Sequence, residues 1–569
     1  MRTQGDLVPA TAVNGDGEPD LTRRSFLGGI GGAAATATIG SLALEPLIGS
    51  RPARAGEIGG ATGASRLDAA YQLRLDQAAR MYAEGSPAHP NNGDEEAYAN
   101  RIASYSKGLP HDAIGQVVPA AYDALLAALA SGEPARFEAI PLAGERRLTN
   151  PQAGLAFDVE GNDPHQFVMA PPPRFASAEE AGEEVELYWM ALLRDTRFND
   201  YDRSPLAQRA AAELSLLSDF RGPTQGGRVT AQTLFRDVLP GATDGPYISQ
   251  FMLLGTPFGA EYVERRMRTL RPGSDHMTLL DEWLAVQNGD VPGSAKYDAN
   301  RCYIRNGRDL AEWVHVDVLF QAYFSACLIL GAPREPRSRP TGGGIGCPVN
   351  PGNPYVDSAT QDGFGTWGPP AFKALLCEVA TRCLKAVWFQ KWFVHRRLRP
   401  EEFGGRIDAH KRGVASYPIH RDVLDSEAAD RVWRLNGTHL LPMAFPEGSP
   451  THPAYGAGHA TVAGGCVTIL KALFDESFEI PRPVVPTDEG TQLRPWRGER
   501  LTVGGELNKL ASNVATGRNI AGVHWRSDAA ESLRLGEAVA IALLRDHQAT
   551  FNEGGSYRFT RFDGTPISI

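Results

Sequence analysis

The stretch AFKALLCEVATRCLKAVWFQKWFVHRRLRP, residues 371–400, combines long helical periodicity with a cluster of cations at its end. Apolar side chains recur three and four positions apart, which predicts one helix over residues 371–399. Pro400 disfavours helical geometry at the preceding residue, so we expect the helix to stop there. On that helix Lys391, His395 and Arg399 are spaced i, i+4 and i+8 and share one face. Taken alone, such a face is also typical of a solvated surface helix.

Helical periodicity continues on both sides of this stretch, whereas alternating strand patterns are scarce. It predicts further helices over residues 117–130, 183–195, 311–330, 459–474, 506–520 and 527–546. We expect residues 311–330 to form a buried core helix and Ser527 to cap the last helix. The sequence therefore predicts an all-α fold, a large single domain of packed helical bundles over residues 56–569. Residues 56–370 would supply the scaffold, and residues 371–550 hold the motifs described below.

The first 55 residues have the features of an export signal. Thr22-Arg-Arg-Ser-Phe-Leu27 precedes a mildly apolar stretch rich in glycine and alanine, and Ala53-Arg-Ala55 is a small-x-small cleavage pattern. This order is the signature of the bacterial twin-arginine (Tat) route. We expect residues 1–55 to be a Tat signal peptide and the mature protein to be periplasmic or secreted. A disordered tail with a chance Arg-Arg pair is the alternative.

Composition narrows the classes of function. The formal net charge is −10, which argues against nucleic acid as a partner. The mature chain has no uninterrupted apolar run of 18 residues, so we expect no membrane span. None of the six cysteines forms a CxxC pair, which makes a zinc knuckle improbable, while one or two disulfides stay open. An anionic substrate would need a locally basic pocket against this acidic background.

A second motif is SPTHPAYGAGHAT, residues 449–461, in which a glycine-containing turn opens the helix at His459. Free N–H groups at a helix N-terminus favour an anion, and Gly458 lets the backbone approach a ligand closely. His459 places a proton-transfer group beside that position. An ordinary helix cap with a solvent-exposed histidine is the alternative interpretation.

A third motif is ATGRNIAGVHWRSD, residues 515–528. Arg518 adds another cation, and His524 lies in a turn ahead of a helix. Asp528 follows four residues later and could orient His524 if the turn folds back. Alternatively, Arg518 and Asp528 are surface ion-pair members and His524 is a core histidine.

Taken together, the three motifs fit a single tetrahedral oxyanion. Lys391, Arg399, Arg518 and the Gly458 N–H could bind its oxygens, because guanidinium groups can bind two oxygens at once. One histidine could bond axially to the central atom, and the other could move protons.

This motif set resembles the vanadium-dependent haloperoxidases, which share it with a superfamily of acid phosphatases. The phosphatase pattern is usually Lys-x6-Arg-Pro, then Pro-Ser-Gly-His, then Ser-Arg-x5-His-x3-Asp. The spacing Lys391-x7-Arg399 is similar instead to the algal bromoperoxidases and their bacterial relatives. Flanking segments that also look like this branch are residues 150–154 (NPQAG), 186–191 (ELYWMA), 390–392 (QKW), 395–396 (HR), 399–401 (RPE), 449–453 (SPTHP) and 508–511 (NKLA).

The resemblance implies a role for each matching residue. His524 would be the axial ligand to vanadium, with Asp528 beside it, and Lys391, Arg399, Arg518 and the Gly458 N–H would hold the vanadate oxygens. His459 would be the acid–base residue for incoming hydrogen peroxide, and Lys391 would also polarise the bound peroxide. Trp388 and His452 match positions expected near the halide path.

One departure concerns Ala457, which stands where the family usually has serine before Gly-His. A hydrogen bond to a charged group contributes roughly 1.5–3 kcal/mol. Its loss should weaken vanadate binding by about one to two orders of magnitude, unless a water replaces the hydroxyl.

The resemblance thus implies a vanadate-dependent haloperoxidase that oxidises halide, by default bromide, with hydrogen peroxide to hypohalous acid, which then halogenates small organic acceptors. It also implies a homo-oligomer. An acid phosphatase of the same superfamily is the first alternative, and a non-enzymatic exported anion-binding protein is the second.

Overall fold

The computed structural model describes residues 64–159, 161–332 and 344–569, and helices dominate these ranges. The residues of the Tat signal lie outside them, so that prediction stays a prediction. The longer helices are α2 (Ala64–Glu84), α4 (Pro119–Ser131), α6 (Ala178–Leu192), α7 (Pro205–Leu214), α9 (Leu280–Gln287), α11 (Gln321–Gly331), α12 (Pro369–Phe389), α13 (Pro400–Lys411), α15 (Glu427–Asn436), α16 (Gly458–Leu473), α17 (Val503–Ile520) and α18 (Arg526–Thr550). The short ones are α3 (Asp94–Ala97), α5 (Pro134–Glu138), α8 (Gln250–Leu253), α10 (Gly307–Trp313) and α14 (Arg421–Leu424). Single turns of 3-10 helix occur at Pro151–Leu155, Pro164–Gln166 and Phe198–Asp200.

The strands are short and peripheral, which confirms the prediction of an all-α fold. They form four separate antiparallel pairs within the described residues. These are β1 (Thr256–Phe258) with β2 (Glu261–Val263), β3 (Met267–Leu270) with β4 (Tyr297–Cys302), β5 (Val484–Pro486) with β6 (Leu493–Pro495), and β7 (Arg558–Thr560) with β8 (Pro566–Ser568).

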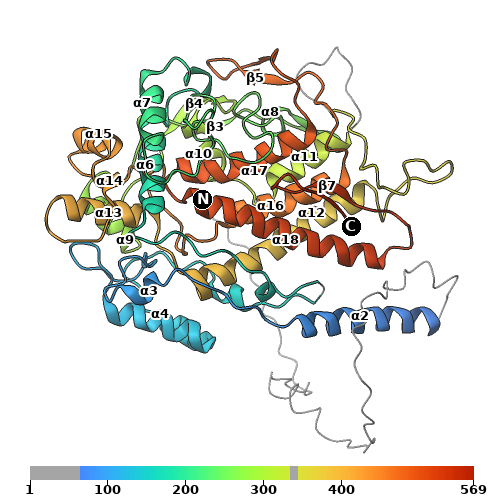
Figure 1. Ribbon diagram of the computed structural model, residues 1–569, viewed down its shortest axis with the longest axis horizontal. Coiled ribbons are helices and arrows are strands. Elements are labelled where there is room, and N and C mark those ends of the chain that lie inside the picture. The colour runs from blue at the N-terminus through green and yellow to red at the C-terminus, as the bar shows by residue number, and fades with distance from the viewer. Residues whose placement is uncertain (1–63, 160, 333–343) are drawn as a thin grey trace, which may run out of the picture. The chain divides into compact units, whose positions relative to one another are not determined.

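The centre of the molecule is a bundle of α12, α16, α17 and α18, all from the C-terminal third of the chain (Figure 1). Nearly every residue of α16 and α17 is buried, because other elements cover these helices on all sides. Close crossing of α16 and α18 depends on glycine. A Cβ at Gly464 would lie 2.1 Å from the carbonyl oxygen of Leu533, and one at Gly536 would lie 2.0 Å from that of Thr461.

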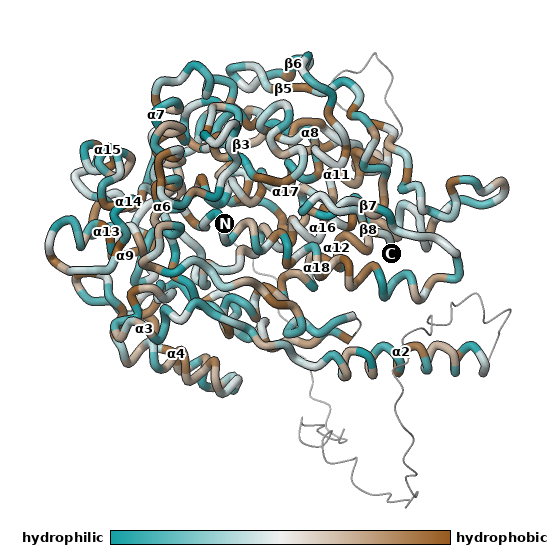
Figure 2. The backbone as a smooth tube through the Cα atoms, in the orientation of Figure 1, coloured by the Kyte–Doolittle hydropathy of each residue, from teal (hydrophilic) through white to brown (hydrophobic). Residues whose placement is uncertain are grey.

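The scaffold half wraps this bundle. Helix α6 packs against α7, α13, α14, α15 and α17 and is buried from Glu180 to Ala191. Helix α18 alternates hydrophobic and hydrophilic residues along its length, as expected of a helix that buries one side (Figure 2). No helix of the described part is both long and apolar enough to cross a membrane. All six cysteines are free, so the disulfides that the sequence left open are absent.

The predicted helix over residues 371–399 is wrong at its C-terminal end. Helix α12 continues only to Phe389, and a π-helical turn, Gln390–His395, follows it. Arg396 then adopts a left-handed conformation with φ of 41°, held in place because its guanidinium binds Glu95. Arg399 precedes α13, and Pro400 occupies the first position of that helix, where the missing N–H has no cost. Lys391, His395 and Arg399 therefore do not share a helix face.

Two further predictions need correction. Residues 311–330 do not form one buried helix, because the chain turns between α10 and α11 and exposes Val316 and Val318. The turn between α10 and α11 carries Asp317, whose carboxylate lies 3.0 Å from the imidazole of His459 in α16. Ser527 does not cap the last helix, which begins at Arg526; its hydroxyl donates to Glu183 instead, at 2.9 Å.

The α16–α18 crossing gives a stability prediction. Gly536→Ala should lower the free energy of unfolding by about 1–3 kcal/mol, because the methyl group must push two helix backbones apart. The higher helix propensity of alanine opposes this by about 1 kcal/mol. Urea denaturation measures the change. Gly365→Ala is the control, since a Cβ there meets nothing within 4 Å; equal effects of both variants would contradict the close-packing account.

Candidate active site

Three cations from three chain segments meet in the interior. Lys391 comes from the π-helical turn, Arg399 from the residue before α13, and Arg518 from the last turn of α17. Lys391 and Arg399 are fully buried, and Arg518 is 6% exposed. The π-helical turn and the chain reversal after it bring Lys391 and Arg399 together although they lie on different elements.

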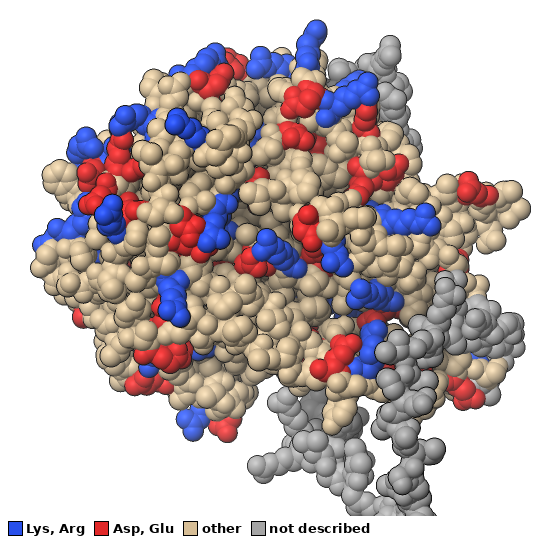
Figure 3. Space-filling view, in the orientation of Figure 1, with Lys and Arg blue, Asp and Glu red and all other residues tan. Residues whose placement is uncertain are grey.

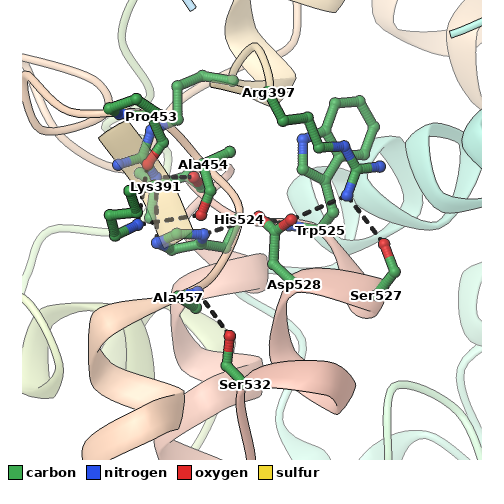
Figure 4. Close-up of polar contacts among 12 residues, drawn as sticks. Lys391, Arg397, Pro453, Ala454, Ala457, His524, Trp525, Ser527, Asp528 and Ser532 are labelled. Carbon is green, nitrogen blue, oxygen red and sulfur yellow. Dashed lines mark hydrogen bonds and ion pairs between the residues drawn. The ribbon is translucent and has the colours of Figure 1, made fainter. Parts of the chain in front are cut away.

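Their hydrogen-bond partners are mostly backbone carbonyls. Lys391 Nζ donates to the carbonyls of Pro453 at 2.8 Å and Ala454 at 3.1 Å (Figure 4). Arg399 donates to the carbonyls of His452 at 2.9 Å and Val523 at 2.6 Å. Arg518 donates to the carbonyl of Val314 at 2.9 Å, and its buried Nε has no partner in the described structure. We call Lys391, Arg399 and Arg518 the cation cradle.

No carboxylate of the described residues forms an ion pair with any member of the cation cradle. Elsewhere charges of both signs are interspersed, as on the surface in Figure 3. Burial and the neighbouring Arg399 hold the pKa of Lys391 well below its usual range, and burial lowers the pKa of Arg518 to about 10. Uncompensated buried charge is costly, so this arrangement favours an anion at its centre.

His524 faces the cation cradle with one nitrogen. Its Nδ1 lies 2.8 Å from Oδ2 of Asp528. The turn that carries His524 therefore folds back toward the start of α18, which is the condition under which Asp528 was expected to orient His524. A carboxylate only accepts, so the ring proton belongs on Nδ1, and the Nε2 lone pair accepts from Arg399 at 3.0 Å. Burial and then Arg399 and Lys391 hold the pKa of His524 well below its usual value, which keeps the imidazole neutral. Neutral imidazole with an accessible lone pair is the form of histidine that can bind a metal.

The N-terminus of α16 forms another wall. Its N-cap is Ala457, which supplies no side-chain acceptor to the first turn, so the first N–H groups stay available to a ligand. The Ala457 N–H itself donates to Ser532 Oγ at 2.7 Å and is fixed in place (Figure 4). A Cβ at Gly458 would lie 3.2 Å from the ring of Trp388, so the backbone of α16 passes close to this indole.

His459, one residue further along α16, pairs with Asp317. Its Nε2 lies 3.0 Å from Asp317 Oδ1, and the imidazole is 23% exposed while the carboxylate is 5% exposed. Asp317 was not predicted as a site residue, because residues 311–330 were expected to form one continuous helix. An acidic residue in the middle of an apolar run was the available signal. A histidine oriented by a carboxylate and partly open to solvent is suited to proton transfer.

Trp388 and His452 lie together beside Lys391. Their ring centroids are 5.0 Å apart, and Lys391 Nζ is 5.8 Å from the indole centroid. His452 Nδ1 lies 2.8 Å from Arg399 Nη2, and burial followed by Lys391 and Arg399 keeps its pKa well below normal. The structure thus assembles Trp388, Lys391, Arg399, His452, Gly458, His459, Arg518, His524 and Asp528 around one site.

The vanadate implied by the sequence fits this site. The cation cradle can neutralise an oxyanion, the unpartnered Arg518 Nε and the α16 N-terminus can donate to it, and His524 offers a lone pair to its central atom. The fold and site together define a helical-bundle protein with a buried cationic site suited to a tetrahedral oxyanion.

Known proteins of similar sequence and structure belong to this class of oxyanion-binding helical-bundle proteins. The family model of the VCPO second helical-bundle domain matches residues 385–553. The chain is 37% identical to the vanadium-dependent bromoperoxidase of Corallina officinalis, covering 89% of this chain and 98% of that one. It is 34% identical to that of Ascophyllum nodosum, over 85% and 93% of the two chains. The homohexameric second vanadate-dependent bromoperoxidase of Ascophyllum nodosum superposes with a TM-score of 0.83 at 31% identity, over 96% of both chains. The chain belongs to the vanadium-dependent bromoperoxidase family.

The cation cradle predicts that oxyanions stabilise the protein. Orthovanadate at 100 times its dissociation constant should add about 2.7 kcal/mol to the free energy of unfolding. Thermal unfolding with and without orthovanadate measures this. Arg518→Met should remove most of the effect, while Arg500→Met, at an 82% exposed side chain, should retain it. A melting temperature indifferent to orthovanadate would contradict oxyanion binding.

Proposed function

We propose that this protein is a vanadate-dependent haloperoxidase that oxidises bromide with hydrogen peroxide to hypobromous acid. The observation that carries the proposal is the cation cradle, three buried cations without carboxylate partners, facing Nε2 of a neutral histidine, the nitrogen that does not bond Asp528. Relatives named as vanadium-dependent bromoperoxidases over most of the chain support the same activity. Small organic acceptors would then be halogenated by the product.

Each site residue has a distinct part in this proposal. Vanadate, when bound, supplies a Lewis-acidic centre that activates hydrogen peroxide toward halide. Lys391, Arg399, Arg518 and the Gly458 N–H hold its oxygens, and His524 Nε2 is the ligand. Asp528 keeps the proton of His524 on Nδ1.

Proton transfer belongs to His459. Asp317 engages its Nε2, which leaves Nδ1 to take a proton from incoming peroxide. Burial of the cation cradle excludes bulk water, so its charges act at short range in a medium of low dielectric constant. Trp388 and His452 flank Lys391 and line the approach that we assign to the halide.

Bromination of monochlorodimedone tests the activity. Protein stripped with chelator should be inactive, orthovanadate should restore turnover with bromide and peroxide, and phosphate should inhibit the restoration. His524→Ala should abolish halogenation while circular dichroism shows an unchanged helical content. Absence of turnover with bromide and iodide at saturating vanadate would contradict the proposal, and hydrolysis of a chromogenic phosphate ester without vanadium would favour the acid phosphatase.

We also propose that the protein is a homo-oligomer that associates through α2. Leu67, Tyr71, Leu75 and Tyr82 are 71%, 62%, 43% and 89% exposed. At about 100° per residue these four positions fall within an arc of about 80°, so they form one apolar stripe. The C-terminal end of α2 is held to the body by Arg80, which pairs with Asp546 at 2.9 Å.

The charges of α2 favour a second copy as the occupant of this stripe. Three basic residues alternate with three acidic ones along the helix, namely Arg66, Asp68, Arg74, Asp76, Arg80 and Glu84. A net charge of zero with alternating signs suits pairing with itself. A solved relative is homohexameric, which supports self-association.

Light scattering after size-exclusion chromatography tests the α2 interface. Tyr71→Glu combined with Leu75→Glu should lower the particle mass by breaking the apolar contact. Leu216→Glu, at an isolated side chain that is 85% exposed, should leave the mass unchanged. A monomeric mass for the wild type would contradict the proposal of a homo-oligomer. An oligomeric mass that persists in the double variant would contradict only the proposal that α2 forms the interface.

We also propose that the protein is exported by the Tat route, and the twin-arginine pattern in residues 22–55 supports this. Replacing Arg23 and Arg24 by lysine should retain the protein in the cytoplasm of a Tat-competent bacterium.

A further inference from the structure

Arg397 lies on the far side of Asp528 from His524, and neither the sequence motifs nor the proposed mechanism uses it. Its Nη1 donates to Asp528 Oδ1 and to Ser527 Oγ, both at 2.8 Å (Figure 4). Its Nη2 donates to Glu183 at 3.0 Å and also binds Glu180. The guanidinium lies 4.6 Å from the ring centroid of Trp525. Arg397 is therefore fixed by three carboxylates and one indole.

This cluster is buried as deeply as the cation cradle. The side chains of Arg397, Glu180, Glu183 and Asp528 are 2%, 1%, 4% and 0% exposed. Burial by itself would lower the pKa of Arg397, but Glu180 and the other two carboxylates raise it above its usual value. The guanidinium therefore stays charged within this buried cluster.

The two oxygens of Asp528 have separate partners. Oδ1 accepts from Arg397, whereas Oδ2 accepts from His524 Nδ1 at 2.8 Å and from the Trp525 N–H at 3.2 Å. A carboxylate held at both oxygens cannot rotate about its terminal bond without breaking a charge-assisted hydrogen bond. The plane of the carboxylate, and through it the orientation of the imidazole, thus depends on Arg397.

His524 is consequently held from both nitrogens by two arginines that lie two residues apart. Arg399 reaches Nε2 directly at 3.0 Å, and Arg397 reaches Nδ1 through Asp528. The chain reversal after the π-helical turn makes this possible. Glu180 and Glu183 extend the connection to α6, so a helix of the N-terminal scaffold contributes to the orientation of the histidine.

We propose that Arg397 is a positioning residue for His524, held in place by Glu180 and Glu183, and that it sets how well the site binds vanadate. The inference rests on the proposed function, because it needs His524 to be the vanadate ligand. Residues that orient a metal ligand commonly change metal affinity by about 10–100-fold when they are replaced. Lysine at position 397 keeps the charge but lacks the planar fork that binds Asp528 and Glu183 together.

Vanadate affinity of the Arg397→Lys protein tests the inference. We expect the dissociation constant, measured by equilibrium dialysis, to rise about 10–100-fold. The KM for bromide should stay unchanged, because Arg397 does not touch the approach lined by Trp388 and His452. The matched control is Arg526→Lys. Arg526 is only 11% exposed and binds Glu186 of α6 through Nε at 2.8 Å, but no contact joins it to Asp528 within the described residues. Arg526→Lys should bind vanadate as the wild type does.

Other outcomes overturn the inference. Vanadate binding by Arg397→Lys at wild-type affinity removes the positioning role, and so does an equal loss in both lysine variants, which would reflect stability alone. If Arg397→Lys does not fold, Glu183→Gln keeps the shape of the network and should weaken vanadate binding in the same direction; wild-type affinity in that variant overturns the inference. A wild-type protein that binds no vanadate contradicts the proposed function itself.

Discussion

Three cations buried in one small volume without a carboxylate partner are the constraint on which the site depends. Lys391, Arg399 and Arg518 repel one another, and the medium around them screens little of that repulsion. Backbone carbonyls of Pro453, Ala454, Val523 and Val314 offset part of the cost by accepting their hydrogen bonds. A bound oxyanion compensates the remainder. The protein thus keeps a destabilising arrangement that binding of its cofactor relieves, which is a common property of functional sites.

The rest of the fold holds the cation cradle in place and orients His524 toward it. Helices α12, α16, α17 and α18 form the central bundle, and these helices and the segments directly adjoining them supply every member of the site apart from Asp317, Arg399 and His452. A group of acidic residues lies around Arg397 and connects to the cation cradle through Asp528 and His524. His524 therefore stands between this acidic group and the cation cradle. That separation keeps the carboxylates from neutralising the cation cradle while still orienting the ligand nitrogen.

Local sequence patterns predicted the helices of the central bundle, and the three motifs supplied Lys391, Arg399, Gly458, His459, Arg518, His524 and Asp528 as candidate site residues. Trp388 and His452 were expected from the family resemblance alone. Periodicity reports burial, and the spacing of Arg518, His524 and Asp528 is short enough for one turn to determine their contact. Local sequence patterns did not predict the structure where contacts with residues far away in the sequence determine the backbone conformation. The end of the helix at His395 depends on Glu95, which binds Arg396 from 301 residues away. Asp317 reaches His459 across 142 residues, and Arg397 reaches Glu180 across 217, so no local window contains either pair.

The proposed function requires the cation cradle to be an oxyanion site. Equilibrium dialysis of the purified protein against orthovanadate measures this binding, since it counts bound vanadate without requiring turnover. We expect one vanadate per chain, displaced by phosphate, and no binding when Lys391 and Arg518 are both replaced by methionine in a protein that keeps its helical content. Absence of binding by the wild type, or binding that survives in the double variant, would contradict it.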